Sequence, residues 1–296
     1  MDRAISTPVA FAAACLGIAV YSAMDVTMKL LTLASGVYCA LLWRSVVGTI
    51  LSGGVYLARR PAWPTRAAMR LHIERGLIVT AMAMLFFWGL ARVPMAQAIA
   101  LCFIAPLLAL GLAVVLLKER IGRDVLGASA IAFAGVLVVA VSTARSGQSE
   151  QALYGTLAVL CAALCYAYNI ILMRRQGAHS DAIEVAFFQN GVMAAVLLCA
   201  APWLGAWPLP SQWPIAIGGA MFATIANILL AWAYSQAPAN RMAPSEYTGF
   251  LWASLFGWAF FHESVRAVTL GGAALIIAGC LIAARRTAAE PMEAAL

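Results

Sequence analysis

Charge is what this sequence has least of. Only 10% of its 296 residues are charged and three are histidine, whereas about 25% charged residues is usual for soluble globular domains. Apolar residues make up 64%, and the mean hydropathy is +0.90. This composition excludes an ordinary soluble enzyme, a disordered protein and a nucleic-acid-binding domain. It predicts an all-α integral membrane protein.

Signals for metal binding, disulfides and catalysis are also missing. The seven cysteines all lie inside apolar runs, and an odd number so placed indicates neither a disulfide framework nor a metal site. No HExxH, GxSxG or Walker A motif occurs. We therefore expect a protein that is not an enzyme and that needs no cofactor or metal ion.

Apolar stretches of about 20 residues recur along the chain, which is the length that a helix needs to cross a ~30 Å hydrocarbon core. Charged, proline-rich or glycine-rich breaks separate ten such stretches, and no connection is long enough to form a soluble domain. Any function must therefore lie between helices, within the bilayer. The predicted spans are residues 8–33, 37–58, 71–91, 94–117, 122–143, 152–173, 182–204, 213–236, 239–261 and 266–285.

Lysine and arginine are distributed unevenly between the two sides of these spans. With the N-terminus inside, fourteen fall on the inner side, four on the outer side, and Arg44 lies within a span, which accounts for all nineteen. Arg75 is counted with the inner group. An excess of basic residues marks the cytoplasmic side. We expect a multi-pass inner-membrane protein with both termini in the cytoplasm, so the net charge of +7 reflects topology rather than a nucleic-acid partner.

The chain repeats itself at an offset of 144 residues. Residues 91–140 align with 235–284 without a gap, and eleven of the fifty positions are identical. This predicts two five-helix units, residues 1–146 and 147–296, around a central cavity. Because five is odd, the second unit enters the membrane in the opposite direction, the arrangement typical of secondary transporters. Matched pairs include Glu119 with Glu263 and two glycine pairs that predict close helix packing, Gly127 with Gly271 and Gly135 with Gly279.

Both units close with an apolar helix, a turn that carries an acidic residue, and a glycine-rich helix. These segments read PLLALGLAVVLLKERIGRDVLGASAIAFAGVLVV and FLWASLFGWAFFHESVRAVTLGGAALIIAGCLIA. They resemble the EamA-type carriers of the drug/metabolite transporter superfamily. The resemblance implies a ten-helix carrier that exports small metabolites, and it is greatest to exporters of aromatic and other amino acids. The alternative substrates are a nucleotide-like or vitamin-like compound or a drug-like cation.

Ionisable side chains inside spans are the first candidates for function, because burying them in a membrane is costly. Arg44 or Lys29 could bind the carboxylate of a zwitterion, and Asp25 its ammonium group. Lys29 lies one helical turn from Asp25, in the favourable order for an ion pair, and could also act at a gate. The alternative is a structural ion pair between the first two spans, with Lys29 reaching outward.

Glu246, two turns into the ninth span, could bind a substrate amine or carry a coupling proton. The alternative is a carboxylate satisfied by Arg241 or a neighbouring amide. Pro106 should kink the fourth span and could act as a gate hinge.

Neutral polar and aromatic residues complete the predicted substrate site. Singly, each amide could instead form a bond between helices, and each ring could pack in the core or against lipid. The expected partners are a small-molecule substrate, the lipid bilayer and protons as a coupling ion, with no obligatory protein partner. The further predicted contacts are Tyr21, Trp88, Tyr166, Asn169, Gln189, Asn190, Asn227, Tyr247 and Trp252.

Overall fold

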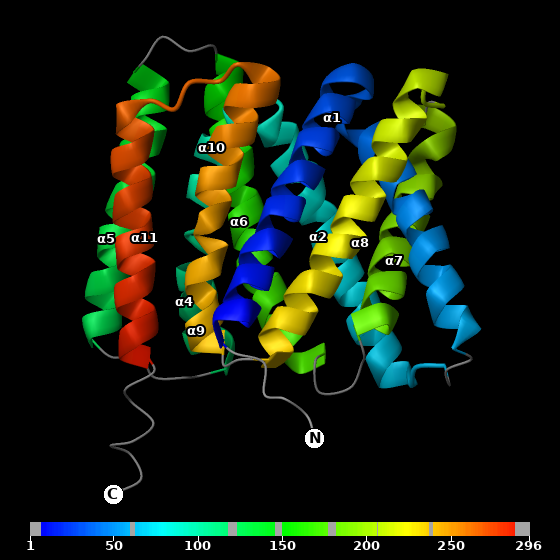
Figure 1. Ribbon diagram of the computed structural model, residues 1–296, viewed down its shortest axis with the longest axis horizontal. Coiled ribbons are helices and arrows are strands. Elements are labelled where there is room, and N and C mark those ends of the chain that lie inside the picture. The colour runs from blue at the N-terminus through cyan, green and yellow to red at the C-terminus, as the bar shows by residue number, and fades with distance from the viewer. Residues whose placement is uncertain are drawn as a thin grey trace, which may run out of the picture.

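Helices account for every regular element in the described part of the chain. The computed structural model describes residues 7–59, 63–117, 123–145, 150–176, 182–205, 207–236 and 239–287, and no strand occurs in these ranges. The start of α1 and the end of α11 lie at the same end of the bundle (Figure 1). In chain order the elements are α1 (Thr7–Ala58), α2 (Arg66–Leu90), α3 (Met95–Cys102), α4 (Ala105–Leu117), α5 (Arg123–Arg145), α6 (Glu150–Gln176), α7 (Ala182–Leu204), the 3-10 turn η1 (Pro210–Gln212), α8 (Trp213–Gln236), α9 (Ala239–Glu246), α10 (Thr248–Phe261) and α11 (Ala267–Thr287).

A single glycine joins the first two predicted spans inside α1. Gly36 has φ 80° and ψ 154°, outside the helical region. A residue with a side chain is strained at this φ, whereas glycine adopts it readily. The chain reverses there, so that α1 rises in dark blue and descends in lighter blue (Figure 1). The predicted boundary between residues 33 and 37 is therefore confirmed.

Six helical segments within the described ranges are long and apolar enough to cross a membrane, with α1 counted once. Two shorter apolar helices, Gly127–Ser142 and Ala267–Ile282, belong to α5 and α11. Many large apolar side chains are exposed, Ile50 and Leu251 among them, as contact with lipid requires. The multi-pass helical architecture is thus found, and the count of ten spans stays a prediction. The six segments are Pro8–Ala58, Arg66–Leu90, Met95–Val114, Glu150–Met173, Ile183–Leu204 and Pro210–Gln236.

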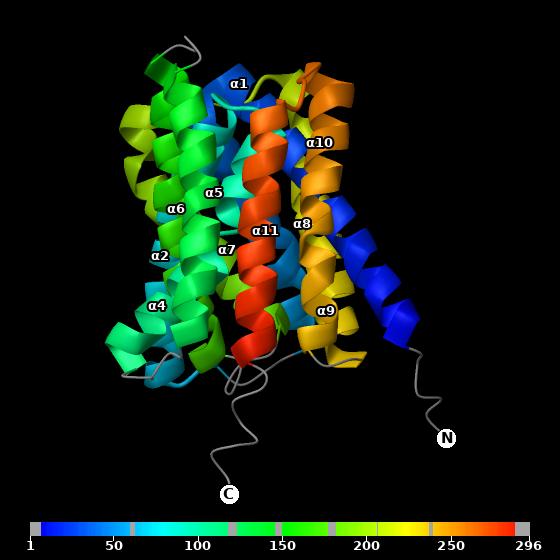
Figure 2. The same cartoon turned by 90° about the vertical axis from the view of Figure 1, so that its left-hand side faces the viewer.

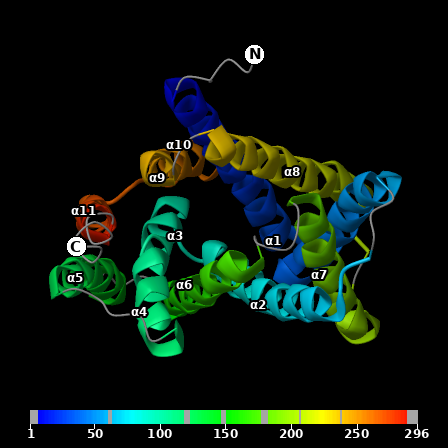
Figure 3. The same ribbon diagram turned by 90° about the horizontal axis from the view of Figure 1, so that it is seen from below.

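Helices of the two predicted units pack against each other rather than forming separate bodies. Seen along the bundle, α1 lies beside α8, and α2 lies beside α6 and α7 (Figure 3). The boundary predicted at residues 146 and 147 lies outside the described residues. Any movement of one unit relative to the other must change these contacts.

Two predicted spans are each divided into two helices, and the divisions are equivalent in the repeat. α3 ends at Cys102 and α9 ends at Glu246, which is the offset of 144 residues. Directly after each end, the rings of Phe103 and Tyr247 pack edge to face, with 5.3 Å between centroids. The Phe103 carbonyl accepts a hydrogen bond from the Cys280 thiol at 3.1 Å. The interrupted helices of both units therefore meet at equivalent positions.

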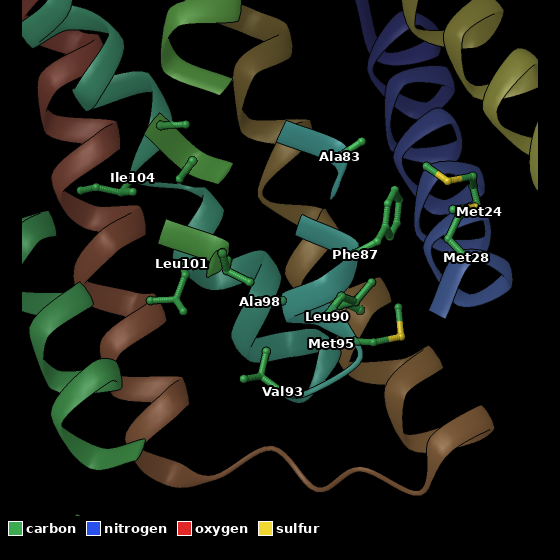
Figure 4. Packing of buried hydrophobic residues seen from close by; sticks show 14 of the residues in the cluster. Met24, Met28, Ala83, Phe87, Leu90, Val93, Met95, Ala98, Leu101 and Ile104 are labelled. Carbon is green, nitrogen blue, oxygen red and sulfur yellow. The ribbon is translucent and has the colours of Figure 1, made fainter. Parts of the chain in front are cut away.

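The main apolar core extends through most of the bundle, and one part of it lies between α1, α2 and α3. Phe87 and Leu90 on α2 and Met95 on α3 face Met24 and Met28 on α1 (Figure 4). Met28, Leu90 and Met95 are fully buried. Because lipid tails are as apolar as these side chains, close packing rather than exclusion of water holds such helices together.

Glycines let α5 and α11 approach backbone to backbone, and the two helices lie side by side (Figure 2). A Cβ atom at Gly135 would lie 2.6 Å from the carbonyl oxygen of Gly272, and one at Gly279 would lie 2.6 Å from a backbone oxygen of α5. The prediction of close packing is wrong for Gly127 and Gly271, because a Cβ atom at either would meet nothing within 4 Å. These two glycines lie on the same helices but away from the contact.

Replacing Gly279 by alanine should therefore destabilise the protein, because α5 and α11 must separate to admit the methyl group. We expect the free energy of unfolding to fall by about 1–3 kcal/mol, measured by thermal unfolding in detergent. Gly271→Ala is the matched control on the same helix and should leave the midpoint unchanged. Equal midpoints for the two variants would contradict the close contact.

Candidate substrate site

Asp25 and Arg44 lie on the two halves of α1 and carry opposite charges that no described residue neutralises by contact. The Asp25 side chain is 7% exposed and forms no hydrogen bond or ion pair with a described residue. The Arg44 Nη2 atom contacts the sulfur of Met193 at 3.6 Å, and its buried Nε atom has no partner. The two charges are within electrostatic reach of each other. They do not form the ion pair that the sequence left open as the alternative.

Tyr21 lies one helical turn before Asp25 on α1 and connects this helix to α8. Its hydroxyl donates to Asn227 Oδ1 at 3.2 Å, and the Asn227 amide nitrogen donates to the carbonyl of Ala223 at 2.8 Å. The second bond orients the Asn227 side chain, since it leaves the amide oxygen facing Tyr21. Both predicted residues are therefore in contact, and they lie beside Asp25.

Glu246 is the last residue of α9, at the interruption of the ninth predicted span. Its carboxylate accepts a hydrogen bond from the hydroxyl of Tyr234 at 2.6 Å, and the side chain is exposed. Tyr166 is within electrostatic reach. The predicted alternative partner, Arg241, has a side chain outside the described ones.

Arg75 lies near the start of the predicted span 71–91 and was counted with the inner basic group, and the structure shows that its side chain is buried. The residue lies in α2 with its side chain 8% exposed. Its Nε atom donates to Asn169 Oδ1 at 3.0 Å, and Nη1 donates to Gln176 Oε1 at 2.5 Å. The sequence signal was its place inside the predicted span 71–91. Because α2 begins earlier, at Arg66, the residue lies more than two turns into the helix.

A chain of hydrogen bonds holds Arg75 in place from two other helices. The amide nitrogen of Gln176 bonds His72 Nδ1 at 2.6 Å, and His72 Nε2 bonds Glu184 Oε1 at 2.9 Å. These residues come from α6, α2 and α7 respectively, so three helices determine where the guanidinium points. Sequence reasoning identified only Asn169 among the partners of Arg75.

Electrostatic interactions join these charged groups and tyrosines into one cluster. Tyr21 interacts with Asp25, Arg44 and Arg75, and Tyr166 interacts with Glu246, Tyr21 and Arg75. We call this group the central polar cluster: Tyr21, Asp25, Arg44, Arg75, Tyr166 and Glu246.

Lys29 has a partner that neither sequence-based interpretation anticipated. Its ammonium group lies 2.5 Å from Glu263 Oε1 and donates to the carbonyl of Val93 at 2.9 Å. The other Glu263 oxygen accepts the backbone N–H of Met95 at 2.7 Å. Pairing with Asp25 and an outward-reaching side chain are both wrong, because Lys29 is 4% exposed and turned toward the loop between α10 and α11.

The local fold places Glu263 where Lys29 needs it. His262 ends α10 in the left-handed conformation, with φ 54°, and so turns the chain back toward the bundle. At Gly257 a Cβ atom would lie 2.8 Å from Glu263 Oε2, so the glycine leaves room for the carboxylate. The repeat alignment had marked Glu263 as equivalent to Glu119, which lies outside the described residues.

Within the described part of the chain, the remaining predicted site residues form no hydrogen bond or ion pair with the central polar cluster. The ring of Trp88 lies under Arg92, 3.6 Å from its guanidinium carbon, and Trp252 packs against Phe256 with 6.1 Å between centroids. Asn190 bonds a carbonyl of its own helix, Gln189 is half-buried beside it, and Tyr247 packs on Phe103. Pro106 is the second residue of α4, just after the interruption between α3 and α4, and its role as a gate hinge stays a prediction.

No group of three or more histidine, cysteine, aspartate or glutamate residues is placed to hold a metal ion in the ranges that the structure describes. The cluster thus consists of fixed charges and hydroxyl groups. Its arrangement suits binding of a charged small molecule rather than bond-making chemistry.

Two equivalent sets of membrane helices with charged side chains buried between them define the protein as a secondary transporter. The chain belongs to the EamA-like transporter family, whose model matches twice, over residues 9–141 and 153–285. The two matches are again offset by 144 residues, in agreement with the repeat. Membership also agrees with the expectation that the protein is not an enzyme.

Several bacterial transporters are similar to this chain. The pseudopaline exporter CntI of Pseudomonas aeruginosa (strain UCBPP-PA14) is 25% identical over 249 residues, which covers 82% of this chain and 84% of that protein. The riboflavin transporter of Brucella anthropi is 24% identical, with 90% and 95% covered, and the S-adenosylmethionine uptake transporter of Rickettsia bellii is 28% identical, with 71% of each covered. A crystal structure that covers 94% of this chain at 20% identity has a TM-score of 0.63 and shows the same fold.

Lys29→Met should destabilise the protein, because it leaves the largely buried Glu263 carboxylate without its counter-charge. Breaking a buried pair from one side costs about 3 kcal/mol or more, and we expect a lower midpoint of thermal unfolding in detergent. Glu263→Gln should act in the same way.

The double variant Lys29→Met/Glu263→Gln provides the test of coupling. It should lose less stability than the sum of the single variants, while Arg70→Gln, at an exposed position of α2, should change nothing. Additive losses would show that the two side chains do not stabilise the protein as a pair.

Proposed function

We propose that this transporter exports small zwitterionic metabolites of the amino-acid type, aromatic and other neutral amino acids among them. The observation that supports this most directly is the relation between Asp25 and Arg44. They carry opposite charges, lie within electrostatic reach and do not pair with each other. Burying such groups unpaired in a membrane is costly, so they are retained for function.

An amino acid offers the two groups that this arrangement lacks. Its carboxylate can take paired hydrogen bonds from the planar guanidinium of Arg44. Its ammonium group can donate to the Asp25 carboxylate, which has no donor among the described residues. The hydroxyl groups of Tyr21 and Tyr166 supply polar edges, and their rings supply flat apolar faces for the substrate side chain.

Alternating access follows from the repeat. In inverted repeats the two units exchange conformations around a site at their interface, and interrupted helices commonly contribute to that site. The contact between Phe103 and Tyr247 joins the two interrupted helices. We propose that the two units move about this contact and that the basic side of the protein faces the cytoplasm. The substrate would then move from the basic side to the opposite side of the membrane.

A larger metabolite is the second candidate substrate. Proteins similar to this chain are named for pseudopaline, riboflavin and S-adenosylmethionine, and none of these is a common amino acid. The two arginines and two acids of the central polar cluster could also bind a metabolite of this size with several charged groups.

Counterflow in proteoliposomes distinguishes the two. Vesicles that contain the purified protein are preloaded with a panel of unlabelled amino acids, and labelled phenylalanine or threonine is supplied outside. Accumulation above protein-free vesicles supports the amino-acid proposal, and Arg44→Gln should reduce it by about tenfold or more through loss of the charged contact. Absence of accumulation by folded protein would reject amino acids and direct the search to riboflavin and other larger metabolites.

Glu246→Gln tests proton coupling. We propose that Glu246 carries the coupling proton, with Tyr234, Tyr166 and Tyr247 as the titratable groups that face it. The variant should keep the fold and lose the pH dependence of counterflow, because an amide cannot take up and release a proton as a carboxylate does. The matched control is Glu74→Gln on α2, which should keep the wild-type profile. An unchanged profile in Glu246→Gln would remove this residue from coupling.

A further inference from the structure

Arg75 is a buried cation that only neutral groups contact. Its two hydrogen bonds end on the amide oxygens of Asn169 and Gln176, and a guanidinium keeps its charge in proteins. Glu184 is the acid nearest along the hydrogen-bond chain, and it bonds His72 rather than Arg75. Among the described residues, no carboxylate pairs with Arg75.

A buried cation with a structural role in this protein is paired with a carboxylate. Lys29, equally buried, has the Glu263 carboxylate at 2.5 Å. Arg75 is instead oriented by two amides that leave its charge available. An unneutralised buried charge costs stability. The anion that balances Arg75 must therefore come from outside the described part of the protein, as a bound ligand would.

The orientation of Arg75 is also fixed before any ligand arrives. Its Nε and Nη1 atoms are held by α6, and Gln176 is held in turn by His72. The Nη2 atom has no bond to a described residue and remains for a ligand. Binding groups fixed in this way lose little conformational entropy when they engage an anion.

Arg44 is the second cation of the same kind. It has no oxygen acceptor among the described residues, and both arginines interact electrostatically with Tyr21. The central polar cluster therefore offers two guanidinium groups, whereas a neutral amino acid has one carboxylate. Occupying both requires a second carboxylate on the same molecule.

We infer that the transported substrate is an amine with two carboxylates, of which acidic amino acids are the simplest. Arg44 binds one carboxylate, Arg75 binds the other, and Asp25 takes the ammonium group. This inference rests on the proposed function, because it assigns the side-chain chemistry of a zwitterion bound at the same cluster. A substrate of this class leaves none of these three charges unpaired.

Glutamate and glutamine provide the test, since they have nearly the same shape and differ by one charge. Counterflow of labelled glutamate by the wild-type protein should be at least about tenfold more efficient than that of glutamine, as expected when a site loses a charged contact. Arg75→Gln should lower glutamate counterflow much more than glutamine counterflow, so that the ratio of the two rates falls toward one. Arg75→Lys keeps the charge and should restore part of the preference. Arg70→Gln is the control and should keep it fully.

The ratio of the two substrates separates this role from a structural one. A purely structural Arg75 would lower both rates together, and that result would overturn the inference, as would equal rates in the wild type. If neither variant folds, the wild type still decides, because glutamate and not glutamine should raise its unfolding midpoint. Counterflow of phenylalanine and threonine without a preference for glutamate would refute the second carboxylate and leave the proposed function standing. No counterflow of any amino acid would reject both.

Discussion

The absence of water from the hydrocarbon core is the constraint on which the rest of this structure depends. Backbone groups in that environment must be satisfied within the protein, and every regular element that the structure describes is a helix. Where a span is interrupted, a neighbour compensates, as the Cys280 thiol does for the Phe103 carbonyl. Helices can then approach only where side chains allow it, and Gly135 and Gly279 provide this between α5 and α11.

The same constraint separates the buried charges into two kinds. The Lys29 ammonium is held by Glu263 and by the Val93 carbonyl, so its charge is balanced and it joins α1 to two turns. Asp25 is buried and Arg44 is partly buried, with its Nε atom shielded, and neither has such a partner among the described residues. In water this difference would be small, because solvent would screen both kinds. In a bilayer, the difference separates charged groups that stabilise the fold from charged groups that need a charged ligand as their partner.

Much of the fold could be predicted because it depends on local pattern. The boundary at Gly36, the interruption before Pro106 and the equivalence of the two units follow from run length, helix breakers and a fixed offset of 144. The site was predicted less completely. Tyr21 and Asn227 were identified and do meet. Arg75 falls inside the predicted span 71–91 but was counted only as an inner basic residue, since a count of basic residues does not show which of them the fold buries.

The sequence by itself determined that this is a helical membrane protein with two equivalent units and acidic and basic residues inside its spans. Composition and periodicity suffice for that, because the bilayer selects apolar runs irrespective of their partners. Only the tertiary structure decided which charges are neutralised. Lys29 and Glu263 are 234 residues apart in the chain, and no local pattern specifies that they meet. Such pairings depend on how α1 and α10 pack, since an ion pair forms only where the fold brings the two atoms within a few ångströms.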